Sequence, residues 1–225
     1  MNLVIFGASG MVGQGVLLEC LRDEGVTGVL VIGRSTAGRQ HAKLQEVLQP
    51  ELFNVDAYAD QLENLDACFF CLGVSSAGMS EDSYHRLTYD LTINVARELA
   101  ARNPGMCFIF VSGSGTDSTT RGRTMWARIK GATENALLAM PFRRAYMFRP
   151  GAIRPLDGIR SKTRAYRIIY MFAGWLFPLL HLLFPRSIVT TREIGRAMLS
   201  VARDGWSKPV LEPSDIHAAA TRSTP

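Results

Sequence analysis

The residues best suited to chemistry come first in the chain, where Gly7, Gly10 and Gly13 follow an apolar run that begins at Leu3. A glycine after a strand permits a tight turn with positive φ. The next glycine leaves room for a diphosphate, and the third lets a helix pack closely on the strand. The first N–H groups of that helix then favour a bound anion. The spacing is G-x-x-G-x-x-G, not the commoner G-x-G-x-x-G, and a plain turn is the alternative. The predicted contact residues are Gly7, Ala8, Ser9, Gly10, Met11, Val12 and Gly13.

The second apolar run ends beside Arg34 and Ser35, and neither residue is acidic. A site that prefers NAD usually has a carboxylate here for the ribose 2′-hydroxyl. A guanidinium instead suits a 2′-phosphate, and Arg39 is a candidate second cation. We therefore predict NADP as the cofactor in preference to NAD, with a solvated arginine as the alternative. Asp56, at the end of the third apolar run, is either an acceptor for the adenine amino group or an exposed turn residue.

Short apolar runs alternate along the chain with helical patterns, which is typical of an α/β fold. The predicted strands are Leu3–Phe6, Val29–Ile32, Leu52–Val55, Ala67–Leu72, Cys107–Val111 and Ala145–Phe148, and the predicted helices are Val12–Arg22, Ser83–Arg102 and Thr124–Ala139. Most runs are continuously apolar, as expected for parallel strands covered on both faces. We predict a doubly wound parallel sheet of the Rossmann type, with its ligand at the carboxyl ends of the strands.

The length of 225 residues suits a single domain. We expect a dinucleotide-binding core over residues 1–155, a small helical substrate-side region over 156–206 and a loose polar tail over 207–225. The net charge of +5 is spread over dispersed Lys and Arg residues. Without a basic run or recognition motif, this charge fits an anionic cofactor and disfavours a nucleic-acid partner.

Four cysteines and four histidines show no metal-ligand spacing, so we expect no metal. Cys68 and Cys71 lie in a predicted strand, where residues three apart face opposite sides and do not form a shared site. Buried thiols in a reducing compartment are the better interpretation. The first residues also lack the basic and apolar pattern of a secretory signal. We therefore expect a cytoplasmic protein.

Five segments resemble motifs of the atypical short-chain dehydrogenase/reductases, especially the Tat-interacting-protein-like and epimerase-like branch. These segments are Gly7–Gly13, Phe69–Ser75, Phe110–Gly115, Lys130–Glu134 and Arg149–Gly151. The resemblance implies an NAD(P)-binding fold and further cofactor contacts at Leu72, Gly73, Val74, Pro150 and Gly151. It also implies that a serine after the fifth strand, Ser112 or Ser114, helps to bind a carbonyl substrate, and that Lys130 binds the nicotinamide ribose.

The sequence departs from this family at Trp126, which stands four residues before Lys130 in place of the usual tyrosine. An indole N–H donates a hydrogen bond but cannot act as a base near neutral pH. Three interpretations follow. Another group supplies the proton, with Tyr84, Tyr89, Ser112 and Ser114 as candidates; the protein binds its cofactor without turnover; or the alignment of this helix is wrong.

Residues Ile168–Pro185 form a stretch of 18 residues without Asp, Glu, Lys or Arg. The length reaches the threshold of about 18 residues for a membrane span, but Pro178 and His181 argue against a spanning helix. We expect a lid over an apolar ligand. The alternatives are a membrane-surface contact, aided by Arg160, Lys162, Arg164 and Arg167 upstream, and a dimer interface.

These observations predict an NADP(H)-binding protein that acts as an oxidoreductase on an apolar carbonyl or alcohol. The alternative function is a non-catalytic interaction protein that senses its cofactor, with or without contact to a membrane surface. Trp126 favours the second function, whereas Lys130 and the serine pair favour the first. The oligomeric state is left open.

Overall fold

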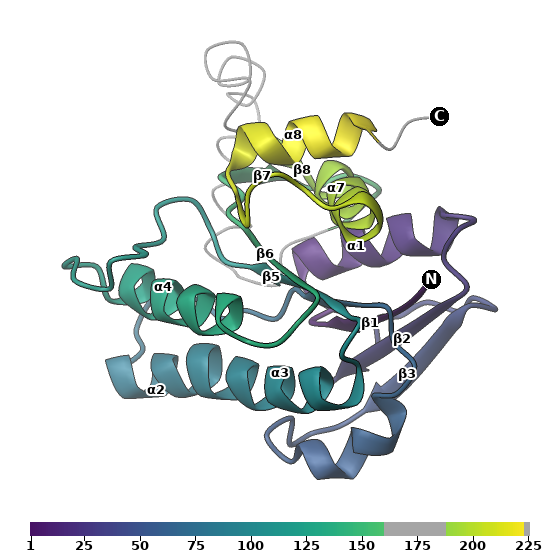
Figure 1. Ribbon diagram of the computed structural model, residues 1–225, viewed down its shortest axis with the longest axis horizontal. Coiled ribbons are helices and arrows are strands. Elements are labelled where there is room, and N and C mark those ends of the chain that lie inside the picture. Colours follow the sequence, from purple (N-terminus) through teal and green to yellow (C-terminus); the bar gives the residue numbers. More distant parts are fainter. Residues whose placement is uncertain (160–187, 223–225) are drawn as a thin grey trace.

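A seven-stranded parallel sheet forms the centre of the computed structural model, which describes residues 1–159 and 188–222 (Figure 1). The strand order is β3-β2-β1-β4-β5-β6-β9. The strands are β1 (Asn2–Phe6), β2 (Gly28–Gly33), β3 (Leu44–Leu48), β4 (Ala67–Phe70), β5 (Cys107–Val111), β6 (Arg144–Phe148) and β9 (Val210–Leu211). The strand order reverses between β1 and β4, which is where such sheets bind ligands. The predicted doubly wound parallel sheet is confirmed.

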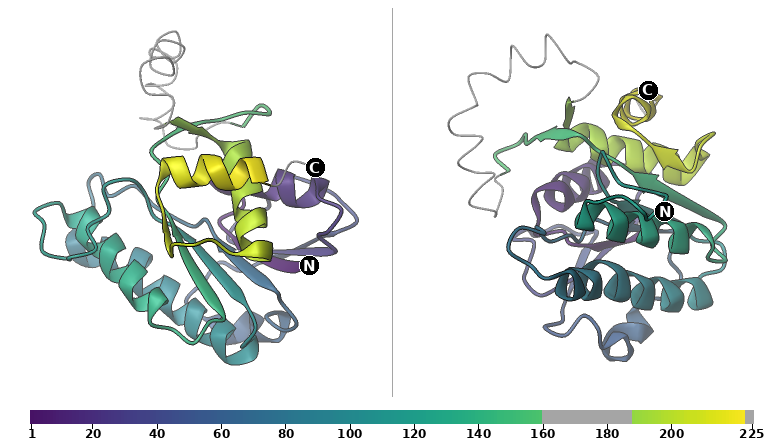
Figure 2. Two further views of the ribbon diagram at one scale, coloured as in Figure 1. Left: turned by 45° about the horizontal axis from the view of Figure 1, so that its top comes forward. Right: turned by 90° about the vertical axis from the view of Figure 1, so that its left-hand side faces the viewer.

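Helices cover both faces of the sheet, as Figures 1 and 2 show. One face carries α1 (Met11–Arg22), α7 (Thr191–Asp204) and α8 (Pro213–Arg222), and α8 lies across α7. The other face carries α2 (Glu81–His85), the π turn η2 (Arg86–Asp90), α3 (Leu91–Arg102), α4 (Met125–Leu138) and the 3-10 helix η1 (Val55–Gln61). The sheet therefore separates two hydrophobic cores.

Alternate residues of each central strand enter opposite cores. In β1, Leu3 and Ile5 pack on the α1 side, whereas Val4 and Phe6 pack on the α3 side, and all four are at most 1% exposed. Complete burial of such a side chain contributes about 1.5–3 kcal/mol. The continuous apolar runs of the sequence are explained by this burial on both faces.

The third strand differs from the prediction. It is β3, at Leu44–Leu48, and not Leu52–Val55. β3 is an edge strand with polar Gln45 and Glu46 among its residues, so it shows no apolar run. Leu52 and Val55 are buried as residues of a loop and of η1. Asp56 consequently lies exposed in the first turn of η1, not at the end of a strand.

The C-terminal residues are more ordered than the loose tail we expected. β9 pairs with β6, and Ile216 and Ala219 of α8 are completely buried. The small apolar residues of α8 recur at helical spacing, which gives that short helix a face to bury. A second, two-stranded sheet joins β7 (Ala152–Arg154) to β8 (Ile188–Thr190).

The apolar stretch Ile168–Pro185 and the basic residues upstream of it lie outside the described residues. Within residues 1–159 and 188–222, no helix has both the length and the apolar character that crossing a bilayer requires.

Candidate functional site

The glycine turn brings the end of β1, the end of β4 and the start of α1 into backbone contact. Gly7 has a φ of +83°, and a Cβ atom there would lie 2.6 Å from the Leu72 nitrogen. A Cβ atom at Gly13 would lie 2.2 Å from the Gly7 carbonyl oxygen. The positive φ and the close helix packing predicted for these glycines are therefore confirmed.

The N-terminus of α1 is open toward this turn. Gly10 is the N-cap residue and offers no side chain to the helix, and the first turn of α1 contains no acidic residue. The Gln14 amide donates to the Ser9 carbonyl oxygen at 3.0 Å, which holds the turn in place. The first N–H groups of a helix have no partner within the helix. In the described part of the chain, a Cβ atom at Gly10 would meet only the Gly7 carbonyl oxygen, at 3.2 Å. The space in front of these N–H groups is therefore open, and a diphosphate would fit there.

Arg34 leaves the sheet beside the glycine turn, because Phe6 of β1 pairs with Ile32 of β2. Arg34, Ser35 and Arg39 are all exposed. Within residues 1–159 and 188–222, the Arg34 guanidinium has no hydrogen bond or ion pair. This guanidinium is therefore available to an anionic ligand.

The segment after β4 runs next to the same turn. The Cys71 N–H donates to the Phe6 carbonyl oxygen at 2.9 Å, and Leu72, Gly73 and Val74 continue beyond it. Burial raises the pKa of the Cys71 thiol to about 12, so the thiol stays protonated near neutral pH. The structure thus brings together the Gly7–Gly13 turn, Arg34 and Leu72. The part of Asp56 as an adenine contact stays a prediction.

The two candidate serines occupy different environments. Ser112 is 7% exposed, and its hydroxyl donates to Glu134 Oε1 at 2.5 Å, with the Phe148 carbonyl oxygen 3.2 Å away. Ser114 is exposed, and its N–H donates to the Pro150 carbonyl oxygen at 3.0 Å. Of the two hydroxyls, only that of Ser114 is open to a substrate. The Ser114–Pro150 bond also places Pro150 and Gly151 beside this loop.

Lys130 projects from α4 and donates a hydrogen bond from Nζ to the Ser112 carbonyl oxygen. Burial lowers the pKa of Lys130 to about 8, and the negative charge of Glu134 opposes this effect. Trp126 lies one turn earlier, and its ring would be 3.6 Å from a Cβ atom at Gly115. The indole therefore lies next to Gly115, in the loop between β5 and α4.

The two tyrosines named as alternative proton donors pack against other parts of the protein. Tyr84 is 2% exposed, and burial raises the pKa of its phenol. Tyr89 packs against His85, with ring centroids 4.8 Å apart. In the described part of the chain, no group of three or more His, Cys, Asp or Glu side chains is placed to hold a metal ion.

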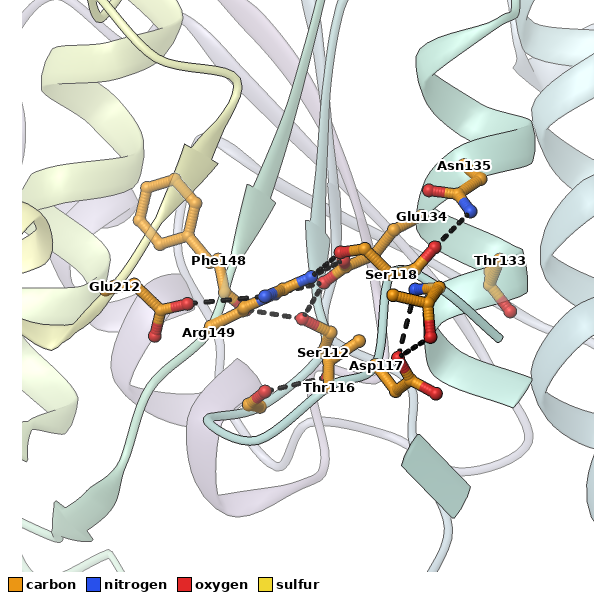
Figure 3. A network of polar contacts seen from close by, with 12 residues as sticks. Ser112, Thr116, Asp117, Ser118, Thr133, Glu134, Asn135, Phe148, Arg149 and Glu212 are labelled. Atoms are coloured by element: carbon orange, nitrogen blue, oxygen red, sulfur yellow. Dashed lines mark hydrogen bonds and ion pairs between the residues drawn. The ribbon is translucent and has the colours of Figure 1, made fainter. Parts of the chain in front are cut away.

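Sequence reasoning missed the ion pair between Glu134 of α4 and Arg149 after β6, which Figure 3 shows. Glu134 is 1% exposed and Arg149 is 9% exposed. Both residues belong to motifs named in the sequence analysis, Lys130–Glu134 and Arg149–Gly151, but neither was given a function there. The sequence did contain one signal, an arginine directly after an apolar strand. Such an arginine is expected to be buried, and a buried charge needs a partner of opposite sign.

No protein-family model matches the sequence. Among curated proteins, the chain is similar to the mitochondrial protein fmp52 of Aspergillus niger, with 30% identity over 182 residues, 77% of this chain and 74% of the relative. The fmp52 of Emericella nidulans is 29% identical over 184 residues, 78% of this chain and 76% of the relative. Protein HTATIP2 of Rattus norvegicus is 28% identical over 154 residues, 68% of this chain and 62% of the relative.

Solved structures share the fold. A short chain dehydrogenase family protein from Francisella tularensis has a TM-score of 0.68 at 17% identity and covers 97% of this chain and 98% of its own. MoeE5, in complex with UDP-glucose and NAD, has a TM-score of 0.68 at 16% identity, covering 93% and 74%. WbmF of Bordetella bronchiseptica, in complex with NAD+, has a TM-score of 0.68 at 13% identity, covering 98% and 77%. Of these three, MoeE5 and WbmF hold NAD.

The predicted cytoplasmic location is wrong, because the fungal relatives are named as mitochondrial proteins. Their names point to mitochondria instead. Free, mostly buried thiols are typical of a reducing compartment, but they do not distinguish the cytosol from mitochondria.

Proposed function

Since the chain belongs to the Fmp52 family of atypical short-chain dehydrogenase/reductases, we propose that it binds a nicotinamide dinucleotide and prefers the 2′-phosphorylated form, NADP(H). The observation that carries the proposal is the free guanidinium of Arg34 beside the Gly7–Gly13 turn. The turn recognises a diphosphate in any such cofactor, whereas a cation at this place favours the additional phosphate.

Each segment of the site then has a role. The first N–H groups of α1 bind the diphosphate, and Arg34 and Ser35 bind the 2′-phosphate with Arg39 as a second cation. Leu72, Gly73 and Val74 line the cofactor beyond β4, and Pro150 and Gly151 line it beyond β6. Lys130 holds the hydroxyls of the nicotinamide ribose.

Binding of the cofactor without phenol-assisted turnover is the function that this geometry supports best. When bound, a nicotinamide supplies a hydride to a carbonyl carbon or removes one from an alcohol. The protein must supply or accept the accompanying proton, yet the Trp126 indole cannot do so near neutral pH. The Ser112 hydroxyl is also engaged by Glu134. On this proposal the chain is a cofactor-sensing interaction protein.

Fluorescence titration with NADPH and NADH tests the cofactor proposal. In the wild type, NADPH should bind more tightly than NADH. Replacing Arg34 with alanine removes charge-assisted hydrogen bonds of about 1.5–3 kcal/mol, so NADPH should bind about 10–100-fold more weakly while NADH changes little. Arg97→Ala is the matched control, an exposed arginine on α3. Equal affinity of the wild type for the two cofactors would reject the role of Arg34.

Reduction of an apolar carbonyl, or oxidation of the corresponding alcohol, is the second candidate function. It is favoured by the exposed hydroxyl of Ser114 and by Lys130, whose pKa of about 8 lies near physiological pH. Trp126→Tyr would place a phenol on the same helix face as Lys130, so any reductase activity should rise by up to about 10²-fold. NADPH oxidation with apolar aldehydes measures this, with Trp126→Phe as control. Identical rates in wild type, Trp126→Tyr and Trp126→Phe would reject the second function.

A further inference from the structure

The Glu134 carboxylate is the centre of a buried network that no site role yet explains. It accepts hydrogen bonds from Ser112 Oγ at 2.5 Å, from Arg149 Nε at 3.0 Å and from Arg149 Nη2. Figure 3 shows the guanidinium and the carboxylate facing one another between α4 and the end of β6. Three hydrogen bonds from two residues fix the position of this carboxylate.

The Arg149 guanidinium extends this network to two further segments. Its Nη2 atom donates to Ser118 Oγ at 2.6 Å in the loop before α4, and Nη1 lies 3.3 Å from Glu212 Oε1 before α8. The Arg149 N–H donates to the Leu211 carbonyl oxygen at 2.8 Å. One side chain thus joins the loop after β5, α4 and the start of α8.

Ser112 links this network to Lys130. Its N–H donates to the Phe148 carbonyl oxygen at 2.8 Å, its hydroxyl donates to Glu134, and its carbonyl oxygen accepts from Lys130 Nζ. The atom on which the lysine ammonium rests therefore belongs to the residue that Glu134 holds. A buried ion pair adds little net stability, because desolvation offsets its attraction. Positioning explains the pair better than stability does.

We propose that Glu134 and Arg149 are positioning residues of the dinucleotide site: they hold in place the Ser112 carbonyl oxygen on which the Lys130 ammonium rests. The inference rests on the proposed function, in which Lys130 holds the nicotinamide ribose. It adds that the charge and direction of this ammonium depend on residues that touch neither cofactor nor substrate.

The electrostatics around Lys130 support a specific role for Glu134. Burial lowers the pKa of Lys130 to about 8, and Glu134 is the charged group that raises it. Helices that pack against α4 carry ionisable groups of their own, with Glu81 and Tyr84 on α2, Tyr89 on η2 and Glu98 on α3. Glu81 is paired with Arg128 at 2.8 Å, and Glu98 with Arg102 at 2.6 Å.

Nuclear magnetic resonance of lysine side chains tests this coupling without any ligand. The chain has four lysines, Lys43, Lys130, Lys162 and Lys208, so ε-¹³C-lysine gives few signals. Lys130→Arg identifies the signal of Lys130, which should titrate near pH 8 in the wild type. In Glu134→Gln the midpoint should fall, because the carboxylate that favours the ammonium is gone. In Glu134→Asp, which keeps the charge, the midpoint should return toward the wild-type value. Glu98→Gln is the matched control and should leave the midpoint unchanged.

NADPH titration of the same variants at pH 7 gives the second readout. Glu134→Gln should weaken binding about tenfold, because a Lys130 ammonium that is no longer held in place loses a charge-assisted hydrogen bond to the ribose. Glu134→Asp should weaken it less, and Glu98→Gln should not change it. If Glu134→Gln does not fold, Arg149→Lys keeps both charges and removes only the planar fork, and it should weaken NADPH binding several-fold.

The outcomes separate the two proposals. If Glu134→Gln, or Arg149→Lys in its place, binds NADPH like the wild type, the positioning role is wrong. If Glu134→Gln weakens binding while the Lys130 midpoint stays the same, the pair is only structural and the inference is also wrong. If the wild type binds neither cofactor, the proposed function fails, and the Lys130 midpoint in Glu134→Gln still decides whether Glu134 controls the lysine.

Discussion

Lys130→Met should change how the stability of the protein depends on pH. Burial lowers the pKa of this lysine from its ordinary value of 10.5 to about 8. Between these two pH values the unfolded chain binds the proton and the folded chain does not, so wild-type stability rises as the pH rises. The difference of 10.5 − 8 = 2.5 pKa units corresponds to about 3 kcal/mol at 1.36 kcal/mol per unit.

Urea denaturation at pH 7 and pH 10 measures this effect. Tyrosines and cysteines also titrate in this range, but they are common to both proteins and cancel in the comparison. From pH 7 to pH 10, the free energy of unfolding of the wild type should increase relative to that of Lys130→Met by most of the 3 kcal/mol, about 2–3 kcal/mol. Lys208→Met is the control, because the Lys208 side chain is 64% exposed. The reasoning is refuted if wild type and Lys130→Met respond to pH in parallel.

Two further predictions separate folding from binding at the glycine turn. Gly13→Ala places a Cβ atom 2.2 Å from the Gly7 carbonyl oxygen. The free energy of unfolding, measured by thermal denaturation, should therefore fall by about 1–3 kcal/mol. In Gly10→Ala the new Cβ atom lies 3.2 Å from the Gly7 carbonyl oxygen, so this variant should fold like the wild type. It should nevertheless bind NADPH at least about tenfold more weakly, because the methyl group occupies the place that the diphosphate must approach. A Gly10→Ala protein with wild-type affinity would show that the diphosphate does not approach this turn.

The central strands, and the φ and packing of the first and last glycines of the turn, could be predicted because their signals are local. Residues of β1 alternate between two apolar cores, and this makes the run from Leu3 to Phe6 continuous. The glycines at 7 and 13 are required by the turn itself, whatever the rest of the chain does. β3 could not be predicted in this way, because an edge strand is half exposed and carries polar residues.

The environment of the serines could not be read from the sequence, because it depends on contacts between distant segments. Ser112 and Ser114 are two residues apart and have similar neighbours in the sequence. Only the fold places Glu134 against Ser112 and leaves Ser114 exposed. The partner of Glu134 is Arg149, which follows β6 and is 15 residues away in the sequence. Burial of Ile216 in α8 likewise needs α7 to be in place, and the sequence of the tail alone suggested a polar surface segment.

A crystal structure of the full chain with saturating NADPH tests the central proposal most directly. In that crystal structure the diphosphate should lie on the first N–H groups of α1, above Gly10, and the 2′-phosphate on the guanidinium of Arg34. An empty site at saturation, or a cofactor whose 2′-phosphate lies away from Arg34, would contradict it.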